Sequence, residues 1–292
     1  METLKELLER GKLLLGSEQN SSCPESSAID AALLLAKASG LSREQVYSRP
    51  DYQLDHEQCK SYFQLLERRQ KGECIAYILG TKEFWGLEFY VGPAVLVPRP
   101  DTETLVEVVI EILRSKPHSK LPLLDLCTGS GAVAIALKHE FPNREVYASD
   151  ISEKALQFAR QNAGNLNCTV NLFQSDLFEV FYEHNRFSLI CANAPYIPTK
   201  DIAGLPLEVQ NEPRIALDGG SDGLEIIRRI INDAPLFLEE GGSLVLEADP
   251  CQMETITELL KKRGFKESQL FCDLAGKNRI ITATFFSILC QK

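Results

Sequence analysis

The sequence lacks the features that would tie a chain to a membrane. Its mean hydropathy is -0.12 over 292 residues. It contains no run of about 18 apolar residues, the length that a membrane-spanning helix needs. The first residues, METLKELLERGKLLLG, form an amphipathic pattern with interleaved acids, without the basic start, long apolar run and small-residue cleavage site of a signal peptide. We therefore expect a cytoplasmic protein with no membrane association.

The patterns of metal sites and disulfide frameworks are also missing. The nine cysteines are scattered and odd in number, and the four histidines stand apart. No CxxC spacing occurs anywhere in the chain. This usage suits a reducing cytosol and argues against a disulfide-stapled fold and a zinc site. We expect no bound metal.

Basic charge is scarce. The chain has 31 Lys and Arg against 41 Asp and Glu, a formal net charge of -10 at pH 7. Such a field repels a polyanion, so no direct nucleic-acid partner is expected. A composition of 44% hydrophobic and 25% charged residues is that of a globular protein and excludes collagen-like and disordered chains. The length fits two domains, or one large domain with an extension.

The first quarter of the chain has only helical patterns. Apolar residues recur at helical spacing, and residues 28–38 predict a nearly all-apolar helix. Ser42 with Gln45, and Asp55 with Gln58, are capping pairs that predict the starts of two further helices. Residues 1–72 are therefore predicted to be all-helical.

After this helical part, strand patterns begin. Residues 84–91 and 94–97 are predicted to be two strands joined by a turn at Gly92-Pro93, and Asp101 is predicted to cap a helix. From about residue 121, strands and helices alternate. The predicted strands are 121–126, 145–149, 169–173, 188–192, 243–247, 269–273 and 280–286. The predicted helices are 131–139, 152–163, 224–238 and 253–262. This alternation predicts a doubly wound α/β domain with a mostly parallel sheet, whose last two strands form an antiparallel hairpin at one edge.

A glycine-rich turn joins the first strand of this unit to its helix, in the run DLCTGSG from Asp125 to Gly131. Glycines let a ligand approach the backbone, and the helix start offers free N–H groups. About 20 residues further on, Asp150 ends the next strand, where a carboxylate can accept both ribose hydroxyls of a nucleoside cofactor. The turn also fits a dinucleotide fingerprint, so NAD and S-adenosylmethionine both remain open here, although Asp125 can bind an amino group. The structural alternative is a tight turn with Asp150 as a helix cap.

The tetrapeptide Asn193-Ala194-Pro195-Tyr196 stands at the end of a later central strand. The Asn193 amide oxygen and a neighbouring main-chain carbonyl are two acceptors that match one –NH2 group. Tyr196 adds a flat wall for a planar substrate. The nitrogen of a planar amide is a poor nucleophile, so aligning it with a methyl donor is a credible source of rate. The alternative is an ordinary Asn-Pro loop.

These features resemble the peptide chain release factor glutamine N5-methyltransferases, the PrmC/HemK family. The tetrapeptide looks like the (N/D)PPY motif of methyltransferases that act on planar nitrogens. The resemblance extends to IAYILGTKEFWGLEFYVGPAVLVPRPDTE (75–103), LLDLCTGSGAVAIAL (123–137), NEPRIALDGGSDGL (211–224) and DLAGKNRI (273–280).

The resemblance implies an S-adenosylmethionine-dependent enzyme that methylates the glutamine of the Gly-Gly-Gln loop in class 1 release factors. It implies a helical substrate-recognition domain (1–73), a linker with a β-hairpin (74–100) and a class I methyltransferase domain (101–292), Rossmann-like with a mostly parallel seven-stranded sheet. We expect a monomer.

By the same resemblance, the residues of the turn line the methionine end of the cofactor: Asp125, Cys127, Thr128, Gly129, Ser130 and Gly131. Asp150 takes the ribose, and Asp176 and Leu177 lie near the adenine. Asn193 touches both cofactor and substrate. Asn193 and the Ala194 carbonyl hold the glutamine amide, Pro195 and Tyr196 shape the substrate pocket, and Asn193 and Tyr196 are the expected catalytic residues.

Three positions depart from the family pattern. Ala194 replaces a proline, which weakens preorganisation but keeps the carbonyl. Cys127 replaces a glycine, and a position with positive φ would be strained there. Leu177 stands where an aromatic is frequent, so any contact with adenine becomes simply apolar.

Three other functions are compatible with parts of this sequence. A DNA adenine-N6 methyltransferase shares the tetrapeptide but needs a DNA-reading surface, which the acidic chain argues against. A non-catalytic protein-binding module would follow if Ala194 marked a decayed site, and an NAD-linked oxidoreductase would need a proton donor beside the turn. Arg99 and Glu103 are interpreted as a structural ion pair rather than cofactor contacts, and Glu247 as support for neighbouring loops.

Overall fold

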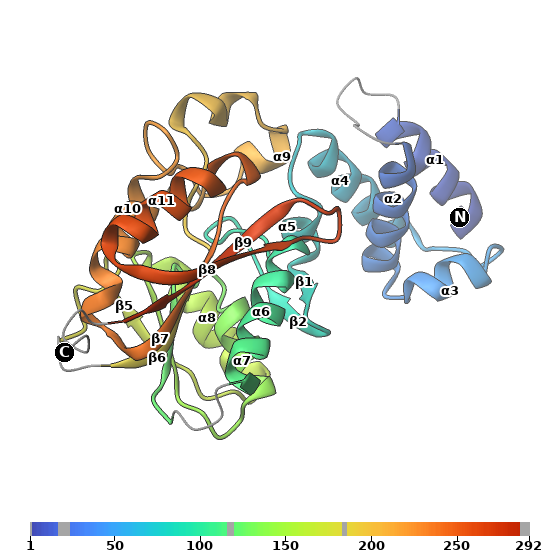
Figure 1. Cartoon of the computed structure of the whole chain (residues 1–292). Helices are drawn as coiled ribbons and strands as arrows, with labels where there is room; N and C mark the ends of the chain where they lie inside the picture. The colour runs from blue at the N-terminus through green and yellow to red at the C-terminus, as the bar shows by residue number, and fades with distance from the viewer. Residues whose placement is uncertain (1, 17–23, 116–119, 183–185, 287–292) are drawn as a thin grey trace, which may run out of the picture. The chain divides into compact units, whose positions relative to one another are not determined.

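The computed structural model describes residues 2–16, 24–115, 120–182 and 186–286 (Figure 1). The chain divides into two compact units. The first comprises residues 1–81 together with the short segment 206–211, and the second comprises residues 82–205 and 212–292.

The first unit is built of helices. They are α1 (Leu4–Gly16), α2 (Pro24–Ser39), α3 (Arg43–Ser48), α4 (His56–Gln70), α5 (Ile75–Leu79) and the one-turn α9 (Leu207–Gln210). Both predicted capping boxes are confirmed: Ser42 accepts from the Gln45 N–H, and Asp55 accepts from the Gln58 N–H at 2.8 Å. The core of this unit is a cluster of buried leucines around Tyr62.

Buried charge ties the distant segment 206–211 to these helices. Arg69 of α4 pairs with Asp30 of α2 at 2.7 Å and with Glu208 of α9 at 2.8 Å. Desolvation raises the pKa of Asp30, and Arg69 opposes that shift. Since a buried carboxylate needs a partner, these two ion pairs hold α2, α4 and α9 together.

The second unit contains a seven-stranded sheet in the order β5-β4-β3-β6-β7-β9-β8. Its strands are β3 (Leu123–Leu126), β4 (Val146–Asp150), β5 (Asn171–Gln174), β6 (Phe187–Ala192), β7 (Leu238–Glu247), β8 (Phe265–Cys272) and β9 (Asn278–Phe285). Neighbours from β5 to β7 are parallel, whereas β9 pairs antiparallel with both β7 and β8. The predicted α/β class and the antiparallel edge hairpin are therefore confirmed.

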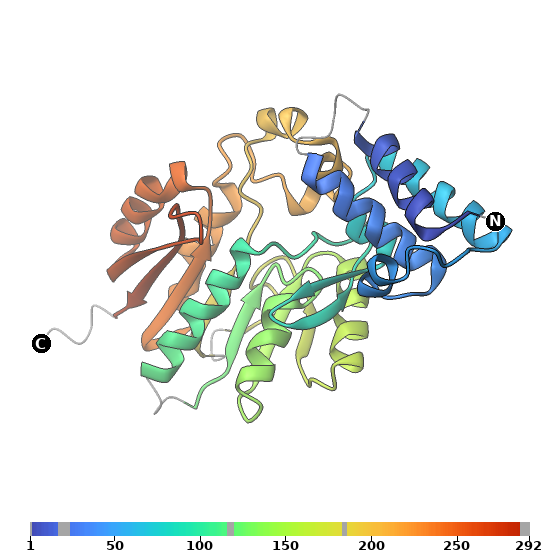
Figure 2. The same ribbon diagram turned by 90° about the vertical axis from the view of Figure 1, so that its right-hand side faces the viewer.

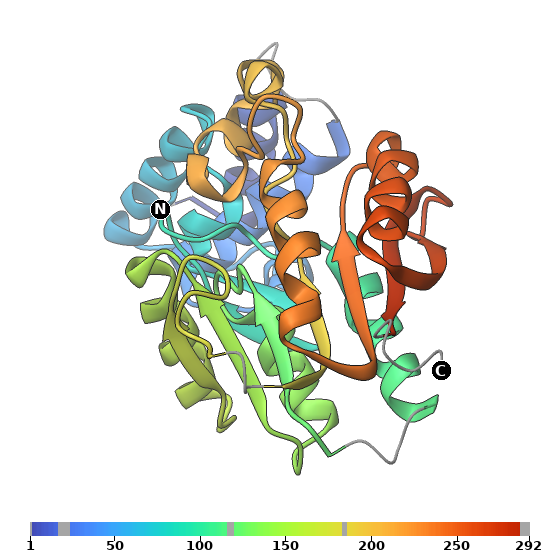
Figure 3. The same cartoon turned by 60° about the vertical axis from the view of Figure 1, so that its left-hand side comes forward.

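Helices cover both faces of the sheet. The helices of this unit are α6 (Asp101–Ser115), α7 (Ala132–Glu140), α8 (Glu153–Asn165), α10 (Glu225–Asp233) and α11 (Met253–Arg263). The core cluster on one face holds residues of α6 and α7, and the cluster on the other holds residues of α10 and α11 (Figures 2 and 3). Short 3-10 turns are η1 (Thr199–Gly204), η2 (Arg214–Ala216), η3 (Ala234–Leu236) and η4 (Pro250–Gln252).

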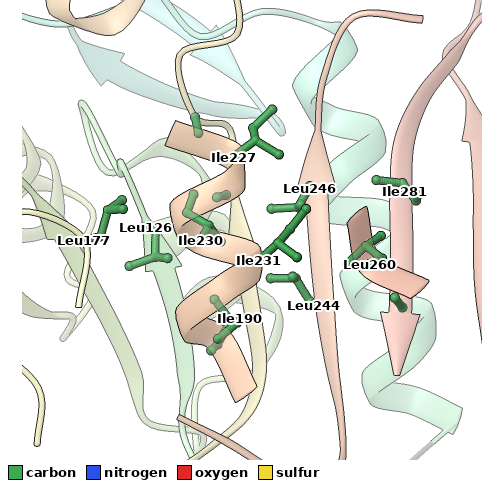
Figure 4. Close-up of a cluster of buried hydrophobic side chains, with 14 of the residues drawn as sticks. Leu126, Leu177, Ile190, Ile227, Ile230, Ile231, Leu244, Leu246, Leu260 and Ile281 are labelled. Atoms are coloured by element: carbon green, nitrogen blue, oxygen red, sulfur yellow. The ribbon is translucent and has the colours of Figure 1, made fainter. Parts of the chain in front are cut away.

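Alternation along the strands decides which side chains enter which core. Leu189 and Cys191 of β6 belong to the cluster with α6 and α7, whereas Ile190 and Ala192 belong to the cluster with α10 and α11. Successive strand side chains point to opposite faces, so a strand buried on both sides reads as a continuous apolar run. Figure 4 shows the isoleucines of α10 lying against the strand leucines of the second cluster.

The predicted hairpin exists but its strands were wrong. Its strands are β1 (Thr81–Phe84) and β2 (Leu87–Tyr90), with the turn at Trp85-Gly86. Both turn residues have positive φ, 55° and 68°. Two such residues make the tight turn whose twist matches a hairpin. Residues 94–97 are not a strand, although Val95 and Val97 are buried.

The helix predicted over 224–238 was also too long. It ends at Asp233, and Pro235 lies in η3 just before β7 begins at Leu238. None of the described helices combines the length and the apolar composition that a membrane span requires. Nor do the described His, Cys, Asp and Glu side chains form a group of three that could hold a metal ion.

Candidate active site

A cavity of about 840 Å³ lies in the second unit at the carboxyl ends of four parallel strands. Cys127 and Gly129 follow β3, Asp150 ends β4, Asp176 follows β5 and Asn193 follows β6; all five line this cavity. The chain runs from β3 to β4 on one side and reaches β6 on the other, so the cavity lies where the strand order reverses. This is the place where open α/β sheets bind ligands.

The turn after β3 has the left-handed backbone that its glycines predict. The φ angles are 57° at Cys127 and 56° at Gly129. Because Cys127 has a Cβ, its backbone is strained at this positive φ, as predicted. Burial and nearby carboxylates raise the pKa of its thiol, so it is not an activated nucleophile.

Asp150 braces the turn while facing the cavity. Its Oδ2 accepts from the Gly129 N–H at 2.8 Å, and its Oδ1 accepts from the Ser152 N–H at 2.9 Å. Each carboxylate oxygen keeps a second lone pair. Burial raises the pKa of Asp150, and the two backbone N–H groups oppose that shift. The group suits a pair of vicinal hydroxyls, which remains a prediction.

Asp125 is almost completely buried and lines a second cavity of about 50 Å³. The two cavities share Leu96, Cys127, Gly129 and Asn193. Asp125 accepts from the Thr128 hydroxyl at 2.6 Å, and burial raises its pKa to about 7. Of the other turn residues predicted to bind cofactor, Thr128 and Ser130 line the small cavity, whereas Gly131 lines neither.

Asp176 and Leu177 also line the main cavity, although they are far from the turn in the sequence. Asp176 pairs with Arg229 of α10 at 2.9 Å. Leu177 has a φ of 52° and is buried in the core cluster of α10 and α11. Sequence reasoning missed Arg229, because nothing in its own helix marks it as a cavity residue.

The tetrapeptide divides between the cavity and the core. Asn193 lines both cavities and Pro195 lines the main one. The Ala194 side chain is 1% exposed and packs in the core, and Tyr196 is half-buried against the same core without lining either cavity. Burial and the nearby Glu247 raise the pKa of Tyr196.

A second glycine run, DGGSDG (218–223), supports the tetrapeptide from behind, and sequence reasoning gave it no role. The Gly219 N–H donates to the Ile197 carbonyl at 2.9 Å. A Cβ on Gly219 would lie 2.7 Å from the Pro195 carbonyl oxygen, and one on Gly223 would collide with the Tyr196 carbonyl. These two positions therefore need glycine because other backbone lies against them.

Two further residues that sequence reasoning did not assign to the site contact Asn193. Its Nδ2 donates to the hydroxyl of Thr102, at the start of α6, at 3.0 Å. Glu247, the last residue of β7, also hydrogen-bonds the Asn193 side chain. Both partners are buried.

Arg99 and Glu103 do not pair with each other. Arg99 pairs with the buried Glu212 at 2.5 Å, and Glu103 accepts from the Trp85 N–H at 2.8 Å. The predicted ion pair between Arg99 and Glu103 is therefore wrong, and Arg99 also lines the small cavity together with Asp125 and Asn193.

The charges around the main cavity suit a cationic ligand. Its described lining carries four carboxylates and two guanidinium groups, and each guanidinium pairs with a lining carboxylate. The pairs are Arg214 with Asp218 and Arg229 with Asp176. Asp150 and Glu225 supply the remaining negative charge, which repels a pyrophosphate and attracts a sulfonium. The residues present therefore fit S-adenosylmethionine.

Comparison with known proteins agrees with this chemistry. Residues 6–80 match the model of the PrmC N-terminal domain family, and residues 123–210 match a methyltransferase domain model. The release factor glutamine methyltransferase of Geobacter sulfurreducens is 41% identical over 258 residues, 88% of this chain and 89% of that protein. The one from Clostridium botulinum is 38% identical over 289 residues, 96% of this chain and 98% of that protein.

The chain belongs to the release factor glutamine methyltransferase family. Solved structures agree with the fold. The T. thermophilus 16S rRNA methyltransferase RsmC, solved with AdoMet and guanosine, superposes with a TM-score of 0.53 at 20% identity, over 70% of this chain and 49% of that chain. A methyltransferase from Pyrococcus furiosus gives a TM-score of 0.52 at 19% identity, over 76% and 98% of the two chains. The family, the class I methyltransferase fold and the cavity make S-adenosylmethionine the cofactor.

Proposed function

We propose that the protein transfers the methyl group of S-adenosylmethionine to the side-chain amide nitrogen of the glutamine in the Gly-Gly-Gln loop of class 1 release factors. The observation that carries this proposal is the position of Asn193, which lines both cavities at the carboxyl end of β6. A side chain there can face a methyl donor and a substrate amide at once. Family membership supports the same reaction.

The tetrapeptide holds the substrate amide. The Asn193 Oδ1 and the Ala194 carbonyl accept the two hydrogens of the glutamine –NH2. Pro195 lines the surrounding pocket, and Tyr196, which lines neither cavity, shapes it from the core. When bound, the cofactor supplies an electrophilic methyl group in line with the amide nitrogen. Because an amide nitrogen is a poor nucleophile, the protein contributes alignment and polarisation of the N–H bonds rather than removal of a proton beforehand.

The cofactor lies along the carboxyl ends of the strands. The turn from Asp125 to Gly131 takes its methionine end, Asp150 takes the ribose hydroxyls, and Asp176 and Leu177 border the adenine. The supporting observation is that the described residues of this set mostly line the two joined cavities. The helical part of the chain (1–73) recognises the release factor, the segment 74–100 is the linker, and residues 101–292 form the methyltransferase domain.

We expect the enzyme to act as a monomer in the cytoplasm, on protein rather than on nucleic acid. The net charge of -10 supports the last point. The test incubates the full chain with methyl-labelled S-adenosylmethionine and a class 1 release factor, the same factor with its loop glutamine changed to alanine, or duplex DNA. Label on the unchanged factor alone supports the proposal. Equal label on the alanine factor, or label on DNA, overturns it.

A further inference from the structure

Three polar side chains meet where β6, β7 and α6 come together. Ala192 and Leu246 are paired in the parallel register of β6 and β7, so the next residues, Asn193 and Glu247, lie side by side at the ends of the two strands. Thr102 is the second residue of α6, and its hydroxyl lies 3.0 Å from the Asn193 Nδ2. Residues 91 positions apart in the chain thus form one small network.

The network is largely buried, and Thr102 lines the small cavity together with Asn193. Thr102 is 5% exposed and Glu247 is 1% exposed. The Glu247 carboxyl group has hydrogen bonds with both Thr102 and Asn193. Burying a carboxylate costs free energy even with such partners, which argues that Glu247 has a role beside Asn193.

The donors and acceptors of these groups fix the direction of the Asn193 amide. A carboxylate only accepts hydrogen bonds, so the Thr102 hydroxyl donates to Glu247 and accepts from Asn193. Asn193 must then present its NH2 group to Thr102 and Glu247. The Oδ1 atom of the Asn193 amide then faces the cavity that this residue lines.

We propose that Thr102 and Glu247 are positioning residues for methyl transfer: the carboxylate of Glu247, directly and through the Thr102 hydroxyl, holds the Asn193 amide with its oxygen toward the substrate. This inference rests on the proposed function, because an outward oxygen is what a substrate –NH2 group needs. The reversed amide would present NH2 to NH2 and repel the substrate.

The state of Glu247 controls this arrangement. Desolvation raises its pKa to about 7, against the opposing charge of Arg279 on β9 and with the like charge of Asp101 on α6. Tyr196 also faces it. Its Oε2 has no hydrogen-bond partner among the described residues and is free to hold a proton.

A protonated Glu247 loosens the network. With its proton on Oε2, the carboxyl group is a neutral and weaker acceptor for the Thr102 hydroxyl and the Asn193 NH2 group, so the amide is no longer held in one orientation. Methyl transfer therefore falls as the pH drops through about 7, the pKa of Glu247 in the folded protein.

The test compares Glu247→Gln and Thr102→Val with the wild type, from below to above pH 7. Thr102→Ser keeps the hydroxyl and serves as the conservative rescue, and Glu254→Gln, an exposed residue of α11, is the matched control. Above pH 7 we expect kcat to fall about tenfold in Glu247→Gln and Thr102→Val, because either amide orientation becomes possible. The affinity for S-adenosylmethionine, measured by calorimetry, should stay within about twofold. Thr102→Ser and Glu254→Gln should behave as the wild type.

A spectroscopic readout keeps the inference testable without turnover. In protein with 15N-labelled asparagine, the side-chain NH2 signals of Asn193 should titrate near pH 7 in the wild type and stay flat in Glu247→Gln. A wild-type Asn193 signal with no titration, or an unchanged kcat and pH profile in Glu247→Gln, overturns the positioning role. If the wild type methylates no release factor, the proposed function fails separately, while the Asn193 signals still decide whether Glu247 orients it. Should Glu247→Gln not fold, the wild-type titration and Thr102→Val decide.

Discussion

Replacing Gly219 by alanine tests whether the second glycine run positions the substrate-binding tetrapeptide. The added Cβ would lie 2.6 Å from the Gly223 carbonyl oxygen and 2.7 Å from the Pro195 carbonyl oxygen. Both obstacles are backbone, which cannot rotate away as a side chain can. Reaching the 3.4 Å of ordinary contact requires a displacement of 3.4 minus 2.6, about 0.8 Å. Gly219 does not have a positive φ, so the substitution adds bulk without backbone strain.

Two effects of different size follow. Overpacking of this kind costs about 1–3 kcal/mol of the free energy of unfolding, which a domain of this size survives. Misplacement of a reacting group by about 1 Å costs up to about a hundredfold in rate. Because Pro195 lines the main cavity, we expect Gly219→Ala to lose about ten- to a hundredfold in kcat while remaining folded.

The assay measures methyl transfer from labelled S-adenosylmethionine to a release factor, together with urea unfolding. Gly204→Ala is the matched control, since its added Cβ has nothing within 4 Å and its φ is not positive. We expect Gly204→Ala to match the wild type in both measurements. Equal kcat values for the two alanine variants would refute the positioning argument.

Two other predictions concern stability. The buried Asn162 side chain accepts from the Tyr90 N–H at 2.7 Å and donates to the carbonyls of Tyr90 at 3.1 Å and Ser130 at 2.9 Å. Asn162→Ala should lower the free energy of unfolding, measured in urea, by about 2–4 kcal/mol. Asn165→Ala, which changes an exposed residue of the same helix, should leave it unchanged. Similar losses in the two variants would contradict this prediction. Asp125 has a pKa raised from 3.8 to about 7, so the folded state binds its proton more tightly than the unfolded state, and its contribution to stability is lost as the pH rises from about 4 to about 7. We expect the free energy of unfolding of Asp125→Asn, measured in urea, to lack this decline with rising pH. Parallel pH profiles for the wild type and the variant would contradict the raised pKa of Asp125.

The elements that the sequence predicted well are those marked by local chemistry. The capping boxes at Ser42 and Asp55 fix helix starts through contacts three residues apart. The buried strands appear as short apolar runs, each ending near its predicted residue. The hairpin was misplaced because residues 84–91 read as one strand, and only the positive φ of Trp85 and Gly86 breaks it.

The residues of the site also differ in whether the local sequence marks them. Asp150 and Asn193 are recognisable because the first ends a strand and the second follows one, and parallel strands bring their ends to one edge. Glu247 also ends a strand, but nothing local marks its contact with Asn193, and Thr102 and Gly219 carry no such mark at all. Their relation to the tetrapeptide depends on the register of β6 and β7 and on the packing of distant loops, which a single sequence does not display.

The measurement that tests the central claim most directly is tandem mass spectrometry of the release factor after reaction with the wild-type enzyme and S-adenosylmethionine. Fragment ions should place one methyl group on the side-chain nitrogen of the loop glutamine, and Asn193→Ala should remove it while S-adenosylmethionine still binds. A methyl group on a main-chain nitrogen, a carboxylate or another side chain, or an undiminished yield with Asn193→Ala, would contradict the account.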